Sequence, residues 1–79
     1  MDDKAIASMT DSELIRTLVD DQIATIKNIR RFAHNPLAQP GHTPEEKAQI
    51  SALWEEAGRR QVRNQVRYLI SEWEKYYGR

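Results

Sequence analysis

Residues 66–77 read VRYLISEWEKYY and hold the strongest apolar stripe of this 79-residue chain. At 100° per residue, the apolar side chains of this stretch fall on one side of a helix. The stripe begins one turn upstream, and its members are Val62, Val66, Leu69, Ile70, Trp73, Tyr76 and Tyr77. The fold therefore depends on what the rest of the chain can lay against this stripe.

The sequence contains the same pattern of a helix N-terminus at two places. A hydroxyl followed three residues later by a glutamate, the pattern of a reciprocal capping box, occurs in residues 10–13 (TDSE) and again in residues 43–46 (TPEE). In the second box, Pro44 stands at the first helical position, where its fixed φ favours the helix. The two boxes predict helices that begin near residues 11 and 44.

The first helix is predicted over about residues 11–34. Its apolar residues recur at helical spacing and form one broad face: Ile15, Leu18, Val19, Ile23, Ile26, Ile29, Phe32 and Ala33. Pro36 should end the helix, because proline disfavours the helical conformation in the residue before it. Residues 35–43 then form a stiffened connector whose length suits two antiparallel helices.

The second helix is predicted over about residues 44–77, with Gly78 just past its end. Its apolar face is divided, since Ile50, Leu53, Trp54 and Ala57 lie on one side and the stripe of residues 62–77 on another. The change falls in residues 58–61, where Gly58 makes a kink plausible. Whether the helix continues through this point or breaks is left open by the sequence.

A continuous second helix would extend beyond the end of the first. Paired across the connector, it would project by about 12 residues, or about 18 Å at the helical rise. The N-terminal arm, residues 1–9, offers little apolar cover. Because large exposed apolar patches on small proteins usually mark an interface, we expect the all-α hairpin to complete a helical bundle by dimerisation or to bind another protein. The alternative is a second helix that breaks near Gly58 and packs back as a monomeric three-helix bundle, with residues 68–77 in its core.

Composition limits the chain to one small domain, residues 1–79. It carries 12 basic and 12 acidic residues and no cysteine, so neither disulfides nor thiolate metal ligands are available. Neither a signal-peptide run nor a stretch long enough to span a bilayer is present in the sequence. We therefore expect a cytoplasmic protein that does not enter a membrane.

A basic row offers a second functional interpretation. Arg59, Arg63 and Arg67 are spaced by four residues, with Arg60 beside them, and a helical hairpin dimer could use this row to contact phosphates. A net charge of zero and the preceding Glu55 and Glu56 argue for an ordinary ion-paired face instead. Nucleic-acid binding is therefore the alternative hypothesis.

No pattern in the chain indicates catalysis, a metal or a cofactor. His34 and His42 lack the spacing of a zinc pair on a helix, and the hydroxyl residues lack a nucleophile motif. The sequence therefore predicts a non-enzymatic protein–protein interaction module, such as an oligomerising adaptor, a regulator or an inhibitor. It would bind through the stripe of residues 62–77, with the arginine row setting orientation through charge pairs.

Overall fold

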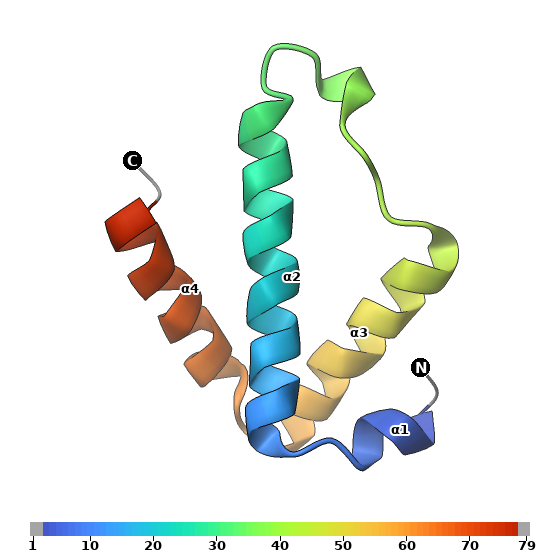
Figure 1. Cartoon of the computed structure of the whole chain (residues 1–79). Helices are drawn as coiled ribbons and strands as arrows, with labels where there is room; N and C mark the ends of the chain where they lie inside the picture. The colour runs from blue at the N-terminus through green and yellow to red at the C-terminus, as the bar shows by residue number, and fades with distance from the viewer. Residues whose placement is uncertain (1–2, 78–79) are drawn as a thin grey trace.

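A computed structural model describes residues 3–77 as four α-helices and one short 3-10 turn (Figure 1). The helices are α1 (Asp3–Ala7), α2 (Asp11–Arg31), α3 (Pro44–Arg59) and α4 (Arg63–Tyr77), and the turn η1 (Pro36–Ala38) lies in the connector. The prediction of an all-α fold is confirmed.

Both predicted capping boxes form. At the start of α2, the Glu13 amide donates to Thr10 Oγ1 (3.1 Å) and the Thr10 amide donates to Glu13 Oε1 (3.2 Å). Thr43 and Glu46 repeat this exchange at the start of α3. These bonds join residues three positions apart, so they do not depend on how the helices pack together.

The far end of α2 comes three residues earlier than the predicted residue 34. The Ala33 amide donates to the Arg30 carbonyl and the Asn35 amide to the Phe32 carbonyl, so the chain tightens into three-residue turns. Asn35 then leaves the helical conformation (φ −144°, ψ 75°), as expected before Pro36.

The single helix predicted over residues 44–77 is wrong, because the chain turns back at residues 60–62. The Val62 amide donates to the Ala57 carbonyl (2.9 Å) and the Gln61 amide donates to the Gly58 carbonyl (3.2 Å). These bonds make a Schellman motif, with Gln61 in the left-handed conformation (φ 60°) that glycine usually supplies. A residue other than glycine costs about 1–2 kcal/mol there. Val62, 5% exposed, packs in the core beside Ala57 and favours the turn.

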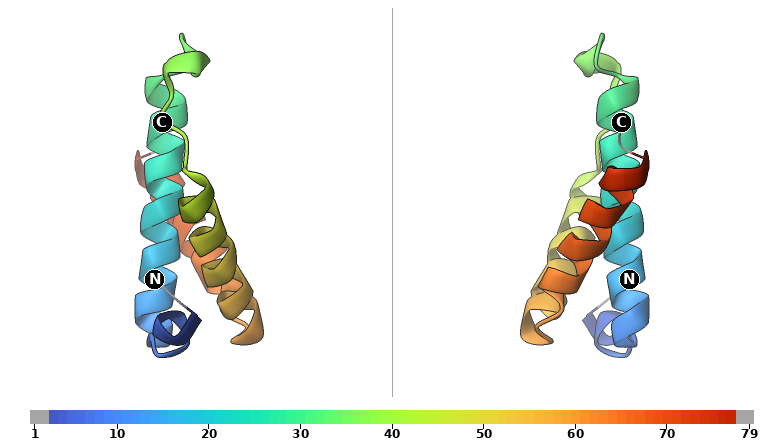
Figure 2. Two further views of the ribbon diagram at one scale, coloured as in Figure 1. Left: turned by 90° about the vertical axis from the view of Figure 1, so that its right-hand side faces the viewer. Right: turned by 90° about the vertical axis from the view of Figure 1, so that its left-hand side faces the viewer.

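After the turn, α4 runs back along α2, so the predicted projecting arm is absent. In Figure 1, α2 stands in the middle, with α3 on one side and α4 on the other. The two outer helices approach each other mainly at the base, where the turn joins them. The molecule is flat, with extents of 39 × 30 × 14 Å, and Figure 2 shows its narrow edge.

The hydrophobic core occupies only the base of this arrangement. Its buried members are Ile6, Leu14, Leu18, Leu53, Ala57, Val62 and Val66. They come from the N-terminal halves of α2 and α4, the C-terminal half of α3, the turn and α1. Farther along α2 the apolar face opens, and Ile29 is 53% exposed.

Arg60 ties the turn to the beginning of the chain. Its Nε donates to Glu56 Oε2 (2.7 Å), and its two terminal nitrogens reach across to the segment that joins α1 to α2. Their acceptors there are the carbonyl oxygens of Ile6, Ala7 and Met9 and the carboxylate of Asp11. The guanidinium thus donates to carbonyls at the end of α1 and in the segment that follows it, beside the buried side chain of Ile6.

The confined core makes a prediction along one helix. Leu18→Ala removes a fully buried side chain at the base of α2 and should cost about 2–5 kcal/mol of unfolding free energy. Ile29→Ala, on the same helix but half exposed, should cost less than about 1 kcal/mol. Urea unfolding followed by circular dichroism measures both. Equal losses would contradict a core limited to the base.

The Arg60 contacts make a second prediction. Arg60→Ala should lower the thermal midpoint by several degrees, because it removes the hydrogen bonds that join the turn to the α1 segment. Arg59→Ala is the matched control, because Arg59 is exposed and its hydrogen bonds reach only Glu56. The control should change the midpoint little, and an equal effect of the two variants would show that Arg60 does not hold α1.

Candidate protein interface

The helix α4 presents an inner and an outer apolar side. Val66 is fully buried, and Ile70 and Trp73 are partly covered against the rest of the chain. The outer side remains in solvent, with Leu69 at 43% and Tyr76 at 74% exposed. Leu69, Trp73 and Tyr76 follow one another at spacings of four and three residues, which places them in a row along the helix.

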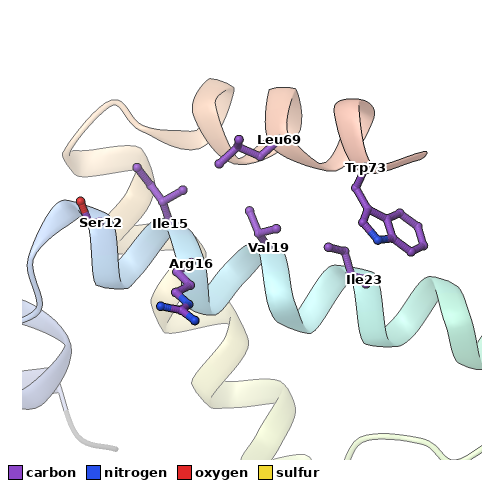
Figure 3. Close-up of a pocket in the computed structure, with 7 residues that line it drawn as sticks. All are labelled: Ser12, Ile15, Arg16, Val19, Ile23, Leu69 and Trp73. Carbon is purple, nitrogen blue, oxygen red and sulfur yellow. The ribbon is translucent and has the colours of Figure 1, made fainter. Parts of the chain in front are cut away.

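An apolar groove runs between this row and α2. Its volume is about 540 Å³, and it is lined by Ser12, Ile15, Arg16, Val19, Ile23, Leu69 and Trp73. In Figure 3, Val19 rises from α2 toward α4, Trp73 hangs from α4 toward α2, and the Arg16 guanidinium points away from α4. The floor of the groove is therefore almost wholly apolar.

Trp73 closes the groove at its far end, beneath two cations. The Lys27 ammonium lies 5.9 Å and the Arg30 guanidinium 6.0 Å from the centroid of the indole ring. Arg30 also approaches Glu74 (3.9 Å), and the Tyr77 ring lies 6.3 Å from Trp73 in a tilted arrangement. Each cation over an indole ring at a partly exposed site contributes about 0.5–1 kcal/mol, so these contacts hold the end of α4 against α2.

The structure divides the predicted interface residues between core and surface. Val62 (5% exposed) and Val66 (fully buried) belong to the core, and Ile70 packs against it. Trp73 is half-buried, whereas the remaining predicted members are on the surface. These surface members are Leu69, Tyr76 and Tyr77.

Sequence reasoning missed the contribution of α2 to this surface. Ile15, Val19 and Ile23 are spaced by four residues, and all three line the groove. Their spacing was visible in the sequence, but their whole face was expected to be covered by the second helix. Tyr68, 63% exposed on α4, is a further surface aromatic that was not predicted as an interface residue.

The predicted arginine row is engaged with its own chain over much of its length. Arg59 donates twice to Glu56 Oε1, at 2.9 and 2.7 Å, and Arg60 makes the contacts with Glu56 and the α1 segment described above. The pKa of the Glu56 carboxyl is lowered by the hydrogen bonds from Arg59 and then from Arg60, despite some loss of hydration. The pKa of Arg60 is raised, chiefly by Glu56.

Arg63 has a structural position as well. Its Nε donates to the Trp54 carbonyl oxygen (2.9 Å), and its guanidinium lies where a Cβ at residue 58 would be, only 2.7 Å from that position. Gly58 thus makes room for a side chain that binds the end of α3. Arg67, the last member of the row, is exposed on α4.

The connector contains a second polar contact. His42 Nδ1 lies 3.3 Å from Glu46 Oε2, and its Nε2 lies 3.7 Å from Asp21 Oδ1 on α2. The pKa of Glu46 is lowered by the hydrogen bond with His42 and by those with Thr43. The described residues contain no group of three or more histidine, cysteine, aspartate or glutamate side chains placed to hold a metal ion.

The glutamate contacts predict the acid stability of the fold. A carboxyl whose pKa is lowered by folding stabilises the protein above its unfolded value of 4.5, and this stabilisation is lost as the pH falls through the folded pKa. Because Glu13, Glu46 and Glu56 all shift downward, the thermal midpoint should fall steadily between pH 5 and pH 3. Scanning calorimetry measures this fall.

The matched variant for the acid test is Glu56→Gln. It should lower the midpoint at pH 6 and give a shallower fall on acidification, because one of the three shifted carboxyls is gone. Parallel curves for the two proteins would contradict a role for Glu56 in the acid transition.

Comparison with known proteins assigns no family. The chain matches no protein-family model, and it has no significant match to a curated protein or to a solved structure. Within residues 3–77, no helix combines the length and apolar character that crossing a bilayer requires.

Proposed function

We propose that this protein is a small non-enzymatic interaction module that associates through the face formed by α2 and α4. The contact residues would be Leu69, Trp73, Tyr76 and Tyr77, together with the wall of the groove on α2. Such a module could serve as an oligomerising adaptor, a regulator or an inhibitor that occupies another protein's surface. A cytoplasmic location suits a chain that contains no cysteine.

The observation that carries this proposal is the concentration of exposed apolar side chains on α4. Six large hydrophobic residues are exposed within the described part of the chain, and four of them lie on α4: Tyr68, Leu69, Tyr76 and Tyr77. Aromatic residues with a polar tip are enriched at interfaces, because the ring can be buried while the hydroxyl stays at a wet rim. Scattered exposed hydrophobic residues need no explanation, but a row beside an apolar groove does.

The total exposed surface supports the same proposal. The chain exposes 5989 Å², whereas a folded monomer of its mass, 9.2 kDa, is expected to expose about 4,900 Å². The excess, about 1,000 Å², is close to the roughly 800 Å² that each partner buries in a stable protein–protein interface. One layer of helices cannot cover its own broad faces, and a second layer would do so.

A second copy of this chain is the partner that we favour. The formal net charge is zero, so two copies meet without long-range repulsion. A two-fold arrangement would place the same apolar face of each copy against the other and build a bundle of helices in two layers.

The arginine row supports nucleic-acid binding less well. Arg59, Arg60 and Arg63 already donate to Glu56 or to backbone carbonyls, so each would have to leave a partner before it contacted a phosphate. A module without net positive charge also lacks the long-range attraction to a polyanion.

Light scattering tests the proposal with a matched pair of variants. Leu69→Asp and Tyr76→Asp each put a charge on the exposed row of α4, and each should convert the oligomer to monomer at tens of micromolar protein while keeping the helical circular dichroism spectrum. Leu37→Asp is the control, because Leu37 is 98% exposed in η1, away from α4. The control should retain the mass of the unaltered protein.

Two results would count against the proposed face. An oligomer whose mass is unchanged by Leu69→Asp and Tyr76→Asp must use another surface. A protein that remains monomeric up to millimolar concentration does not associate with itself, and the excess surface would then belong to a different partner.

A further inference from the structure

A single residue sends α4 back along α2. Of the three residues between α3 and α4, Arg60 keeps helical backbone angles (φ −86°, ψ −4°), whereas Gln61 has φ 60°. Gln61 is the only residue other than glycine with a positive φ in the described part of the chain. The direction of α4 therefore depends on one backbone conformation that a glutamine side chain disfavours.

The sequence around this hinge suits an uninterrupted helix. No proline occurs between residues 45 and 77, and Gly58 is the only glycine in that stretch. Arginine and glutamine at positions 60 and 61 are good helix formers. Local preference thus favours the straight form, and tertiary contacts at the base favour the bent form.

We infer that two copies of this protein exchange α4: the hinge at Gln61 straightens, residues 44–77 become one helix, and the α4 segment of each copy packs on α2 of the other. This inference rests on the proposed self-association and adds an exchange of helices to the contact between the α2–α4 faces. Exchange of an identical element is a low-cost route to a dimer, because the contacts of the closed form are formed again between copies.

The contacts of α4 make the exchange nearly neutral. The helix packs chiefly on α2, through Val66, Ile70 and Trp73, with Arg30 beside Glu74, and all of these contacts would reappear across the dimer. The Schellman bonds of the turn would be replaced by ordinary helical bonds through residues 58–62. The left-handed conformation of Gln61 would be relieved in both copies.

The closed form keeps one contact that the straight form gives up. Arg63 Nε donates to the Trp54 carbonyl because the chain folds back, and its guanidinium occupies the space left by the missing side chain of Gly58. In a continuous helix, residue 63 would lie about 13 Å farther along the axis than Trp54, so this bond would be lost. Gly58 therefore favours the bent form and Gln61 favours the straight form. Substitutions at the two positions should shift the dimer dissociation constant in opposite directions.

The test compares Gln61→Gly with Gly58→Ala by light scattering over a range of protein concentrations. Glycine at position 61 removes the penalty of the bent form and weakens the straight helix, so the dimer dissociation constant should rise roughly tenfold or more. Alanine at position 58, which is helical in both forms, displaces the Arg63 guanidinium from the bent form alone, so the constant should fall. The free-energy change at the hinge enters twice in each case, because an exchanged dimer contains two hinges.

Gly41→Ala is the matched control. Gly41 lies in the connector, an added Cβ there meets nothing within 4 Å, and its φ is not positive. Its constant should equal that of the unaltered protein. Circular dichroism of each variant verifies that it is folded.

The outcomes separate this inference from the proposed face. Opposite shifts in the two hinge variants support exchange, because only exchange straightens the hinge. A dimer that is unaffected by either hinge variant overturns exchange and leaves surface association standing. Monomers in every variant, Gly58→Ala included, overturn both, and any other pattern of shifts overturns exchange.

Discussion

The turn at residues 60–62 is the constraint on which the rest of the structure depends. Gln61 adopts a left-handed backbone there, and the conformation is held in place by groups on both sides of it. Val62 packs in the core, Arg60 binds the segment after α1, and Arg63 binds the end of α3. If the chain of a single copy continued straight through this point, α4 would leave α2, and Val62 and Val66 would lose their cover.

The parts of the fold that could be predicted were those determined by interactions between residues close in the sequence. Both capping boxes announced a helix start correctly, because Thr10 with Glu13 and Thr43 with Glu46 bond within one helical turn. The turn at Gln61 was predictable only in part: Gly58 indicated a possible break near this point, but the sequence left open whether the helix continues. A helix end of this type is normally marked by glycine, whereas here the left-handed residue is a glutamine that distant contacts stabilise.

The same reasoning explains what could be predicted of the candidate interface. The sequence placed Leu69, Tyr76 and Tyr77 on an apolar stripe, and the structure shows that these three side chains are exposed. The burial of Val62 and Val66 could not be identified, since it depends on the direction in which α4 leaves the turn. The groove wall on α2 was hidden for a related reason: its residues were expected to be covered by one continuous second helix, whereas α2 packs on α3 and α4 separately.

The side-by-side placement of α3 and α4 has a consequence for the motions of the molecule. The two outer helices share α2 as their support and approach each other mainly at the base, so each can loosen at its tip without disturbing the other. Backbone amides should accordingly exchange with solvent in a gradient that is slowest near Leu14 and Leu18 and fastest toward the connector and the end of α4. A partner could therefore separate the tips of α3 and α4 while α2 stays folded.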